Sequence, residues 1–306
     1  MASMNPKTAA WYGGGVSAFL LPGAGSIFYV SSAARGGADT NDGLTPDTAW
    51  LRIDYAVGQC SGVTDDYIFV IDHDDATETY PIAVDVDHVH LFGNPWTGSG
   101  PYANLPRVRI VGDVDGFDVS ADRFELAGFN INTTAQADTA NLVHLLSTSS
   151  AHHIHHNTFA WNWWGSDFCL NFEVGGTAGS DSVVENNYFG AHGWNAAGNA
   201  IWLSGQCGRV VIRENLFIQT GFQDGGDCIA LASLNHICVL NNEFVVKDAA
   251  DGEAIQASVG SETNLFSGNV AFQGAVALGF NPFRDLGDND WGLNYIGIAP
   301  AYPTTV

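Results

Sequence analysis

A short sequence phrase returns along this chain at nearly constant intervals, and this repeat limits the possible folds more than any other feature. Each copy has an apolar residue, an asparagine three positions later and a second apolar residue two positions after that. The asparagines of five copies follow one another after 30, 28, 27 and 27 residues: Asn157, Asn187, Asn215, Asn242 and Asn269. Repeats of this length are typical of solenoids, in which each unit packs against the next one.

The composition of the repeats favours strands over helices. β-Branched and aromatic residues occur in short runs between clusters of Gly, Asp and Asn, and the chain has 36 glycines but only 10 Lys plus Arg. We therefore expect an all-β fold in which each unit is one coil of a parallel β-helix, with coils about 4.8 Å apart. Equivalent side chains would then form ladders, with asparagines stacked in a turn and phenylalanines stacked in the core. The predicted phenylalanine ladder consists of Phe159, Phe189, Phe217 and Phe244.

The β-helix domain is predicted to span residues 28–280 in about seven or eight coils. Its phenylalanine column is extended towards the N-terminus by Phe129, 30 residues before Phe159. Residues 1–27 and 281–306 have no regular period but contain many aromatic residues, and we expect them to be extended arms that dock on a partner. The arm residues assigned to this docking are Trp11, Tyr12, Phe19, Leu20, Leu21, Trp291 and Tyr295.

A short amphipathic helix is expected over about residues 46–57. Thr45 precedes Pro46, an arrangement typical of a helix N-terminus. The apolar residues that would share one face of this helix are Trp50, Ile53 and Val57. Such a helix would cover the open end of the first coil, whose unpaired strand edge would otherwise promote aggregation.

These segments together resemble a known superfamily. The segments "GADTNDGLTPDTAWLRIDYAV", "YIFVIDHDDATETYPIAV" and "VHLFGN", followed by the Asn-x-Phe coils, are similar to right-handed parallel β-helix proteins of the pectate-lyase-like superfamily. The resemblance implies a single-stranded right-handed parallel β-helix. It does not imply one function, because the superfamily includes lyases, hydrolases, phage tailspikes and non-catalytic virion proteins.

One segment resembles a catalytic motif of that superfamily. "GGDCIALASLNHICVLNN" is similar to the G-D-D-C-I-A segment of polygalacturonases, which use paired carboxylates as acid and base. Gly226 replaces the first Asp of the pair, and Asn199 stands where the other Asp of the family would fall. We therefore expect these positions to form turns rather than an active site. If the chain is an enzyme, its catalytic residues would be Asp224, Asp227 and Glu253.

A pectate-lyase site is not expected either. Such lyases use an Arg base beside calcium-binding Asp residues, whereas Arg213 has Glu185 and His155 in its column.

A cluster of histidines and two acidic loops are the candidate metal-binding residues of the sequence. Four histidines lie close together, but alternate strand residues face opposite sides, so at most two can converge. These histidines are His152, His153, His155 and His156. Two acidic loops have the oxygen-rich composition that suits Ca²⁺ without the spacing of a calcium loop: Asp72, Asp74, Asp75 and Glu78, and Asp285, Asp288 and Asp290. We expect no metal and no cofactor, with Ca²⁺ kept as the alternative.

The column one residue before the inward aliphatic position is expected to point outwards, yet four of its five members are apolar. The column consists of His153, Val183, Val211, Cys238 and Leu265. Exposed apolar stripes are usually covered by a partner. We assign Val183, Val211 and Leu265 to assembly, most simply of a homotrimer.

The charge and the cysteines narrow the choice of partners. The formal net charge is −23, which disfavours nucleic acid and bare polyanionic sugars. No segment resembles a membrane span, and the five cysteines lack metal-binding or framework spacing, which suits free thiols.

We expect a virion structural protein, a phage decoration, cement or spike subunit that docks on capsid or tail proteins. The alternative is a polysaccharide-degrading enzyme or glycan-binding module, favoured by the possible sugar-stacking residues Trp161, Trp163, Trp164, Trp194 and Trp202.

Overall fold

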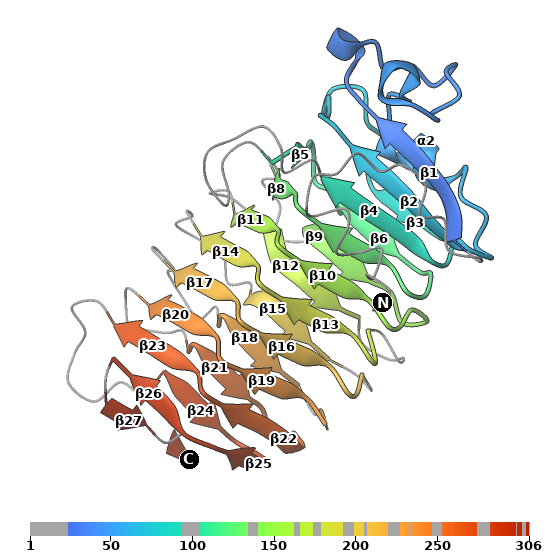
Figure 1. Ribbon diagram of the computed structural model, residues 1–306. Helices are drawn as coiled ribbons and strands as arrows, with labels where there is room; N and C mark the ends of the chain where they lie inside the picture. Colours follow the sequence, from blue (N-terminus) through green and yellow to red (C-terminus); the bar gives the residue numbers. More distant parts are fainter. Residues whose placement is uncertain are drawn as a thin grey trace, which may run out of the picture.

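The computed structural model describes most of the chain. The described residues are 24–93, 105–133, 140–161, 166–173, 179–191, 199–204, 207–219, 227–232, 234, 236–246, 253–273, 282–297, 299–301 and 304–305. They form three long sheets, which we call sheets A, B and C, wound around one hydrophobic core (Figure 1).

Each sheet takes one strand from successive coils. Sheet A contains β1 (Ala24–Val30), β2 (Asp65–Val70), β4 (Val89–Gly93), β7 (Glu125–Ala127), β10 (His153–His155), β13 (Val183–Glu185), β16 (Val211–Arg213), β19 (Cys238–Leu240), β22 (Glu262–Ser267) and β25 (Asp288–Trp291). Sheet C contains β5 (Arg107–Ile110), β8 (Asn130–Thr133), β11 (Thr158–Trp161), β14 (Tyr188–Ala191), β17 (Leu216–Gln219), β20 (Glu243–Val246), β23 (Val270–Gln273), β26 (Asn294–Ile296) and β27 (Ala299–Ala301). Sheet B contains β3 (Ile82–Val84), β6 (Phe117–Val119), β9 (Ala140–Leu145), β12 (Ser166–Phe172), β15 (Asn199–Leu203), β18 (Ile229–Leu231), β21 (Ile255–Ala257), β24 (Phe283–Asp285) and β28 (Thr304–Thr305).

The chain visits the sheets in the order A, C, B and then returns to A. Within the described residues, seven coils from β4–β5–β6 to β22–β23–β24 have all three strands, and an eighth begins with β25 and β26. Neighbouring strands are parallel except for β26 and β27. This order confirms the predicted parallel β-helix, and parallel crossovers of this kind are almost always right-handed.

An asparagine ladder closes the turn between sheets A and C. Asn187 donates from its backbone N–H and from Nδ2 to Asn215 Oδ1, at 2.9 and 3.1 Å. Asn215 Nδ2 donates in turn to Val184 O and Asn242 Oδ1, both at 3.0 Å. The residue before each asparagine has a positive φ: His156, Asn186, Glu214, Asn241 and Gly268. A side chain at each turn therefore satisfies the buried amide of the coil before it.

Phenylalanine rings stack beside this ladder inside the core. The rings of Phe159, Phe189, Phe217 and Phe244 follow one another at centroid distances of 4.9, 4.7 and 4.8 Å. Phe129 does not belong to this column, contrary to the sequence prediction. Ile131 pairs with Phe159, while the N–H of Phe129 donates to Asn157 Oδ1 at 3.1 Å. Phe129 therefore occupies the asparagine position of a coil that lacks the asparagine.

The ends of the solenoid differ from the predicted boundaries. β1 begins at Ala24 and pairs with β2, and β24, β25 and β26 continue the three sheets beyond residue 280. Asn294 adds a rung to the asparagine ladder by accepting the N–H of Asn269 at 3.0 Å. Its spacing from Asn269, shorter than in the other repeats, hid this coil from the sequence prediction. Residues 1–23 lie outside the described residues, and most of the predicted N-terminal arm falls there.

The predicted helix at residues 46–57 is interrupted. Pro46–Thr48 form a 3₁₀ turn and α2 spans Ile53–Val57, because Ala49 is extended and Trp50 bridges to Val30. Thr45 caps the first turn as predicted, since its hydroxyl accepts the N–H of Thr48 at 3.2 Å. Another short 3₁₀ turn, η1, spans Ala33–Arg35. No helix among the described residues has the length and apolar character needed to span a membrane.

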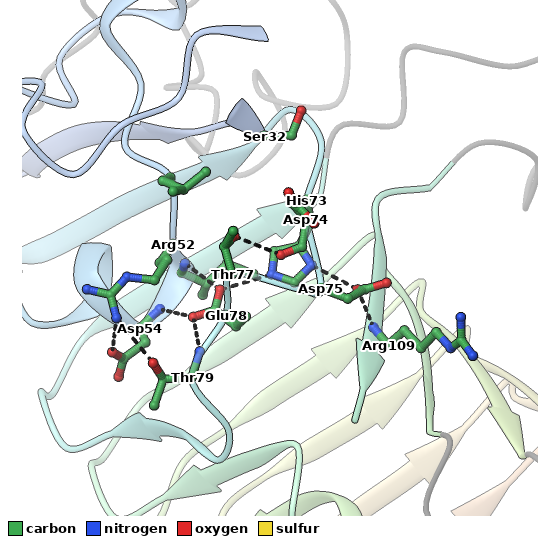
Figure 2. Close-up of polar contacts among 12 residues, drawn as sticks. Ser32, Arg52, Asp54, His73, Asp74, Asp75, Thr77, Glu78, Thr79 and Arg109 are labelled. Carbon is green, nitrogen blue, oxygen red and sulfur yellow. Dashed lines mark hydrogen bonds and ion pairs between the residues drawn. The ribbon is translucent and has the colours of Figure 1, made fainter. Parts of the chain in front are cut away.

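A buried histidine joins the loop after β2 to the start of α2 (Figure 2). His73 contacts Glu78 Oε2 through Nε2 at 2.9 Å and Asp75 Oδ1 through Nδ1 at 3.2 Å. The Glu78 carboxylate also accepts the N–H groups of Ile53 and Asp54, the first residues of α2. Burial alone would lower the pKa of His73, but the hydrogen bonds and charges of Asp75 and Glu78 raise this pKa to about 9.

The loop after β2 is also one of the two acidic loops considered above as calcium ligands. Asp72 accepts hydrogen bonds from Ser31 and Ser32, while Asp75 and Glu78 are engaged as described above. In the other acidic loop, Asp285 accepts the indole N–H of Trp291 at 2.9 Å. These carboxylates contact different parts of their own chain, and the expectation of no metal, with Ca²⁺ as the alternative, stays a prediction. All five cysteines are free thiols.

Candidate functional sites

The outer face of sheet B carries a row of polar and aromatic residues, one from each coil. The strand register places these residues side by side on neighbouring coils. The hydrophobic residues next to each of them along its strand point into the core. In order, the row is Asp118, His144, Asn171, Trp202, Ala230, Gln256 and Arg284. All but Ala230 are half-exposed. Because coils are about 4.8 Å apart, the row forms a straight recognition strip.

Two aromatic rings form a flat surface in the middle of this row. Phe168 stacks beside Trp202 with ring centroids 5.7 Å apart and an interplanar angle of 16°. Both side chains are half-exposed, although each belongs to a strand that also supplies core residues. Such a surface suits a planar or ring-shaped ligand. Of the five tryptophans predicted to contact sugars, Trp202 alone has a described side chain.

An acidic pair surrounds His144 at the N-terminal end of the row. His144 Nδ1 contacts Asp115 Oδ2 at 2.9 Å and lies 3.6 Å from Asp118 Oδ1. Burial would lower the pKa of His144, but the hydrogen bonds and charges of both carboxylates raise this pKa to about 9. The imidazole therefore carries a proton at neutral pH. The three ligand atoms also lie within 4.8 Å of one another, but a metal ion would have to displace this proton, so we describe the cluster as an ion pair.

Three buried polar atoms of this cluster have no hydrogen-bond partner within the described part of the chain. They are His144 Nε2, Asp118 Oδ1 and Asn141 Oδ1. An unsatisfied buried polar atom costs about 1–3 kcal/mol. Because these atoms are covered, the hydroxyl groups of a ligand on this face would reach them only after rotation of the surrounding side chains.

Asp227 and Glu253, named as the catalytic residues only if the chain is an enzyme, lie at the other end of sheet B. Asp227 is 4% exposed, and burial together with the neighbouring Glu253 raises its pKa to about 9. Its Oδ1 accepts the N–H of Glu253 at 2.8 Å, just as Asn199 Oδ1 accepts the N–H of Asp227 at 2.7 Å. Glu253 also contacts Arg284 Nη1 at 3.3 Å. Asp224 lies outside the described residues.

This geometry favours a turn over a pair of catalytic carboxylates. The side chains of Asp227 and Glu253 are hydrogen-bonded to each other, whereas glycosidases hold their two carboxyl groups roughly 5 Å or more apart. Asp227 has little contact with solvent and already caps a backbone amide. These contacts suit a structural role in the turn, and the role of the pair stays a prediction.

The outer face of sheet A carries the column that was predicted to point outwards. His153, Val183, Val211, Cys238 and Leu265 pair with one another in register. The first four are half-buried and Leu265 is 40% exposed. Towards the N-terminus the same column continues with Tyr67, His90 and Glu125. The column thus has a polar half and an apolar half.

The four neighbouring histidines separate as the strand alternation predicts. His153 and His155 share the outer face of β10, with ring centroids 4.0 Å apart. His152 is buried, which lowers its pKa to about 4, and His156 occupies the exposed turn. The sequence analysis did not anticipate Glu125, which contacts both His153 and His155. No asparagine phrase marks the coil of Glu125, so its register was not visible in the sequence.

Two predicted docking residues lie near the C-terminal end of the solenoid. Trp291 stacks on Phe266 with ring centroids 4.3 Å apart, so it extends the core instead of belonging to a free arm. Tyr295 pairs with Val270 on sheet C and is half-exposed. The predicted docking residues Trp11, Tyr12, Phe19, Leu20 and Leu21 lie outside the described residues.

The topology defines this protein as a parallel β-helix, the architecture that the sequence resemblance implied. No protein-family model matches the sequence, and no curated protein matches it. Among solved structures the fold is similar to that of a rhamnogalacturonan lyase, with 14% sequence identity and a TM-score of 0.46 over 92% of this chain and 85% of the other. This similarity concerns the fold alone.

Proposed function

We propose that the outer face of sheet B binds an uncharged glycan chain. The observation that carries the proposal is the recognition strip, in which the Phe168 ring lies one coil and the Trp202 ring two coils from the unsatisfied polar atoms around His144. Glycans present both apolar ring faces and hydroxyl groups. The strip offers indole and phenyl surfaces for the former and hydrogen-bonding atoms for the latter.

Spacing and charge define the class of glycan. Consecutive coils repeat at about 4.8 Å, close to the length of one sugar unit in an extended chain, so successive units can meet successive coils. Asp115, Asp118 and Glu253 make the face acidic, and the whole chain has a net charge of −23. Both features disfavour a polyuronate and favour a neutral polysaccharide.

Binding without cleavage is the expected outcome. Asp227 and Glu253 are in direct contact, and Asp227 is buried beneath its own turn. Release of reducing ends from a polysaccharide by the wild type, abolished in Asp227→Asn, would overturn this part of the proposal and make the protein a hydrolase.

Replacement of the indole tests the proposal. Trp202→Ala is expected to weaken binding to the best ligand of a neutral polysaccharide panel by about 10- to 100-fold, because the flat surface beside Phe168 is lost. Binding is measured by affinity electrophoresis and titration calorimetry.

The matched control is Phe272→Ala, which removes a 41% exposed aromatic ring from the outer face of sheet C. This variant should bind like the wild type. Equal weakening by both variants, or wild-type binding confined to polyuronates, would contradict the proposal.

A virion structural role is the second candidate, and the apolar half of the sheet A face favours it. Val183, Val211 and Leu265, with Cys238 between the last two, form a continuous apolar strip on the side of the rod. We propose that two further copies of this chain cover the strip in a homotrimer, and that the terminal segments dock on capsid or tail proteins of a phage particle.

A charge placed in the strip tests this assembly. Val211→Lys is expected to convert a trimer into monomers, because a buried lysine at a threefold contact would be unpaired in every copy. Light scattering after size exclusion measures the mass. Val245→Lys, on the outer face of sheet C, is the control and should stay trimeric. A monomeric wild type would reject the assembly.

A further inference from the structure

A carboxylate surrounded by imidazoles lies on the outer face of sheet A, away from the recognition strip. Glu125 Oε1 is 3.0 Å from His155 Nε2 and 3.3 Å from His153 Nδ1. Glu125 Oε2 contacts His90 Nδ1 at 2.5 Å. These four residues come from three consecutive coils, on β4, β7 and β10. Register alone brings them together, because the equivalent outward positions of neighbouring coils are adjacent.

We propose that Glu125, His153 and His155 bind a divalent transition-metal ion of the zinc class. Their ligand atoms, one carboxylate oxygen and two ring nitrogens, all lie within 4.8 Å of one another. In a tetrahedral site with bonds of about 2.0–2.1 Å, neighbouring ligand atoms are about 3.3 Å apart. The observed separations from Glu125 Oε1 are close to this value, so an ion fits with small adjustments of the rings.

The surrounding groups orient the ligands in the way that metal sites require. The other ring nitrogen of His153, Nε2, contacts Glu185 Oε1 at 2.9 Å. The other ring nitrogen of His155, Nδ1, contacts His156 Nδ1 at 2.8 Å. Metal-binding histidines almost always donate the N–H of their second nitrogen to a carboxylate, a backbone carbonyl or water, as His153 does to Glu185. The imidazole of His156 can accept from His155 in the same way. His90 has the same supporting role on Glu125 Oε2.

An ion pair with a residue of the next coil holds Glu185, the carboxylate that contacts His153. Glu185 is held by Arg213, whose Nη2 lies 2.6 Å from Glu185 Oε2. This ion pair fixes the carboxylate that orients His153.

The contacts of His153 with two carboxylates require a positive charge, either a second proton on the imidazole or a metal ion. When His153 donates its Nε2 proton to Glu185, its Nδ1 presents a lone pair to Glu125 Oε1. A lone pair that faces a buried carboxylate oxygen is repulsive unless a cation lies between them.

Burial divides the site into a closed and an open side. The Glu125 and His155 side chains are 2% and 6% exposed, whereas His153 is 29% exposed. Three protein ligands with one solvent-facing side are typical of sites that keep a fourth position for water or substrate. The ligand set of two imidazoles and one carboxylate suits Zn²⁺ and neighbouring first-row ions better than Ca²⁺ or Mg²⁺, which prefer oxygen atoms.

Titration of the full chain with Zn²⁺ tests the proposal directly. The chelator-treated protein should bind one Zn²⁺ per chain by calorimetry, and Co²⁺ should give the intense visible absorption of a four-coordinate site. Glu125→Gln should weaken Zn²⁺ binding by more than about 100-fold, and Glu185→Gln, which removes only the support of His153, by about 10- to 100-fold. If circular dichroism shows that Glu125→Gln does not fold, the weaker Zn²⁺ binding of Glu185→Gln and the Co²⁺ spectrum of the wild type test the proposal instead.

Two control variants separate this site from other histidines. His236→Asn removes an exposed imidazole from a turn of positive φ that asparagine tolerates, and it should bind Zn²⁺ like the wild type. His144→Asn removes the imidazole of the ion pair on sheet B and should also leave binding unchanged. Loss of binding in His144→Asn, several weak ions per chain, or full binding in Glu125→Gln would each overturn the proposal.

Discussion

Replacement of one asparagine in the middle of the ladder, Asn215→Ala, is expected to lower the free energy of unfolding by about 3–5 kcal/mol. Asn215 Oδ1 accepts two hydrogen bonds from Asn187, and its Nδ2 donates to Val184 O and Asn242 Oδ1. The alanine leaves these partners buried and unsatisfied, at about 1–3 kcal/mol for each group before relaxation. Urea denaturation followed by circular dichroism measures the loss.

The control for this prediction is Glu243→Ala. Glu243 follows Asn242 directly but is exposed on sheet C, so its replacement should change stability by less than about 0.5 kcal/mol. Equal effects of the two variants would show that the ladder contributes no more than a surface position. A change in the denaturant dependence itself would point instead to partial unfolding of the solenoid.

The buried His73 is expected to make the protein less stable as the pH rises above neutrality. Its pKa in the folded chain, about 9, exceeds the ordinary value of 6.5, so the folded state binds this proton more tightly. The stabilisation is complete below about pH 6.5 and is lost as the pH rises towards about 9. It amounts to about 3 kcal/mol, from the free energy that corresponds to such a difference in pKa.

Glu78→Gln isolates this contribution from those of other titrating groups. The amide oxygen can still accept the N–H groups of α2, but one of the two charges that raise the pKa of His73 is gone, while that of Asp75 remains. The decline in stability between pH 6.5 and 9 should therefore be shallower than in the wild type. Glu243→Gln should retain the wild-type decline. Parallel profiles for all three proteins would refute the role of His73.

The register of the central coils can be predicted from the sequence because the same residue type fills the same position in each of them. Asparagine satisfies the turn and phenylalanine fills the core in coil after coil, so their spacing alone gives the register from Asn157 to Asn269. Where another residue takes a position, the pattern disappears. Phe129 in the asparagine column and the early Asn294 at the C-terminus led to a wrong register at one end and a wrong boundary at the other.

The candidate sites were harder to predict because they are assembled across coils of unequal length. His153 and His155 are adjacent in the sequence, but Glu125 joins them only through strand register. The same holds for Trp202 and His144, which lie 58 residues apart in the sequence and two coils apart in space. The contact between Asp227 and the backbone of Glu253 depends on side-chain packing that no spacing rule contains.

The last coil has a consequence for how the molecule behaves at high concentration. β27 runs antiparallel to β26, and Trp291 lies over the Phe266 ring. A further parallel coil, whether from this chain or from a neighbouring molecule, would need β26 as its template, and β27 already occupies that edge. The reversal therefore leaves sheet C with a short antiparallel edge that a further parallel coil cannot extend in register, while β25 stays the edge strand of sheet A.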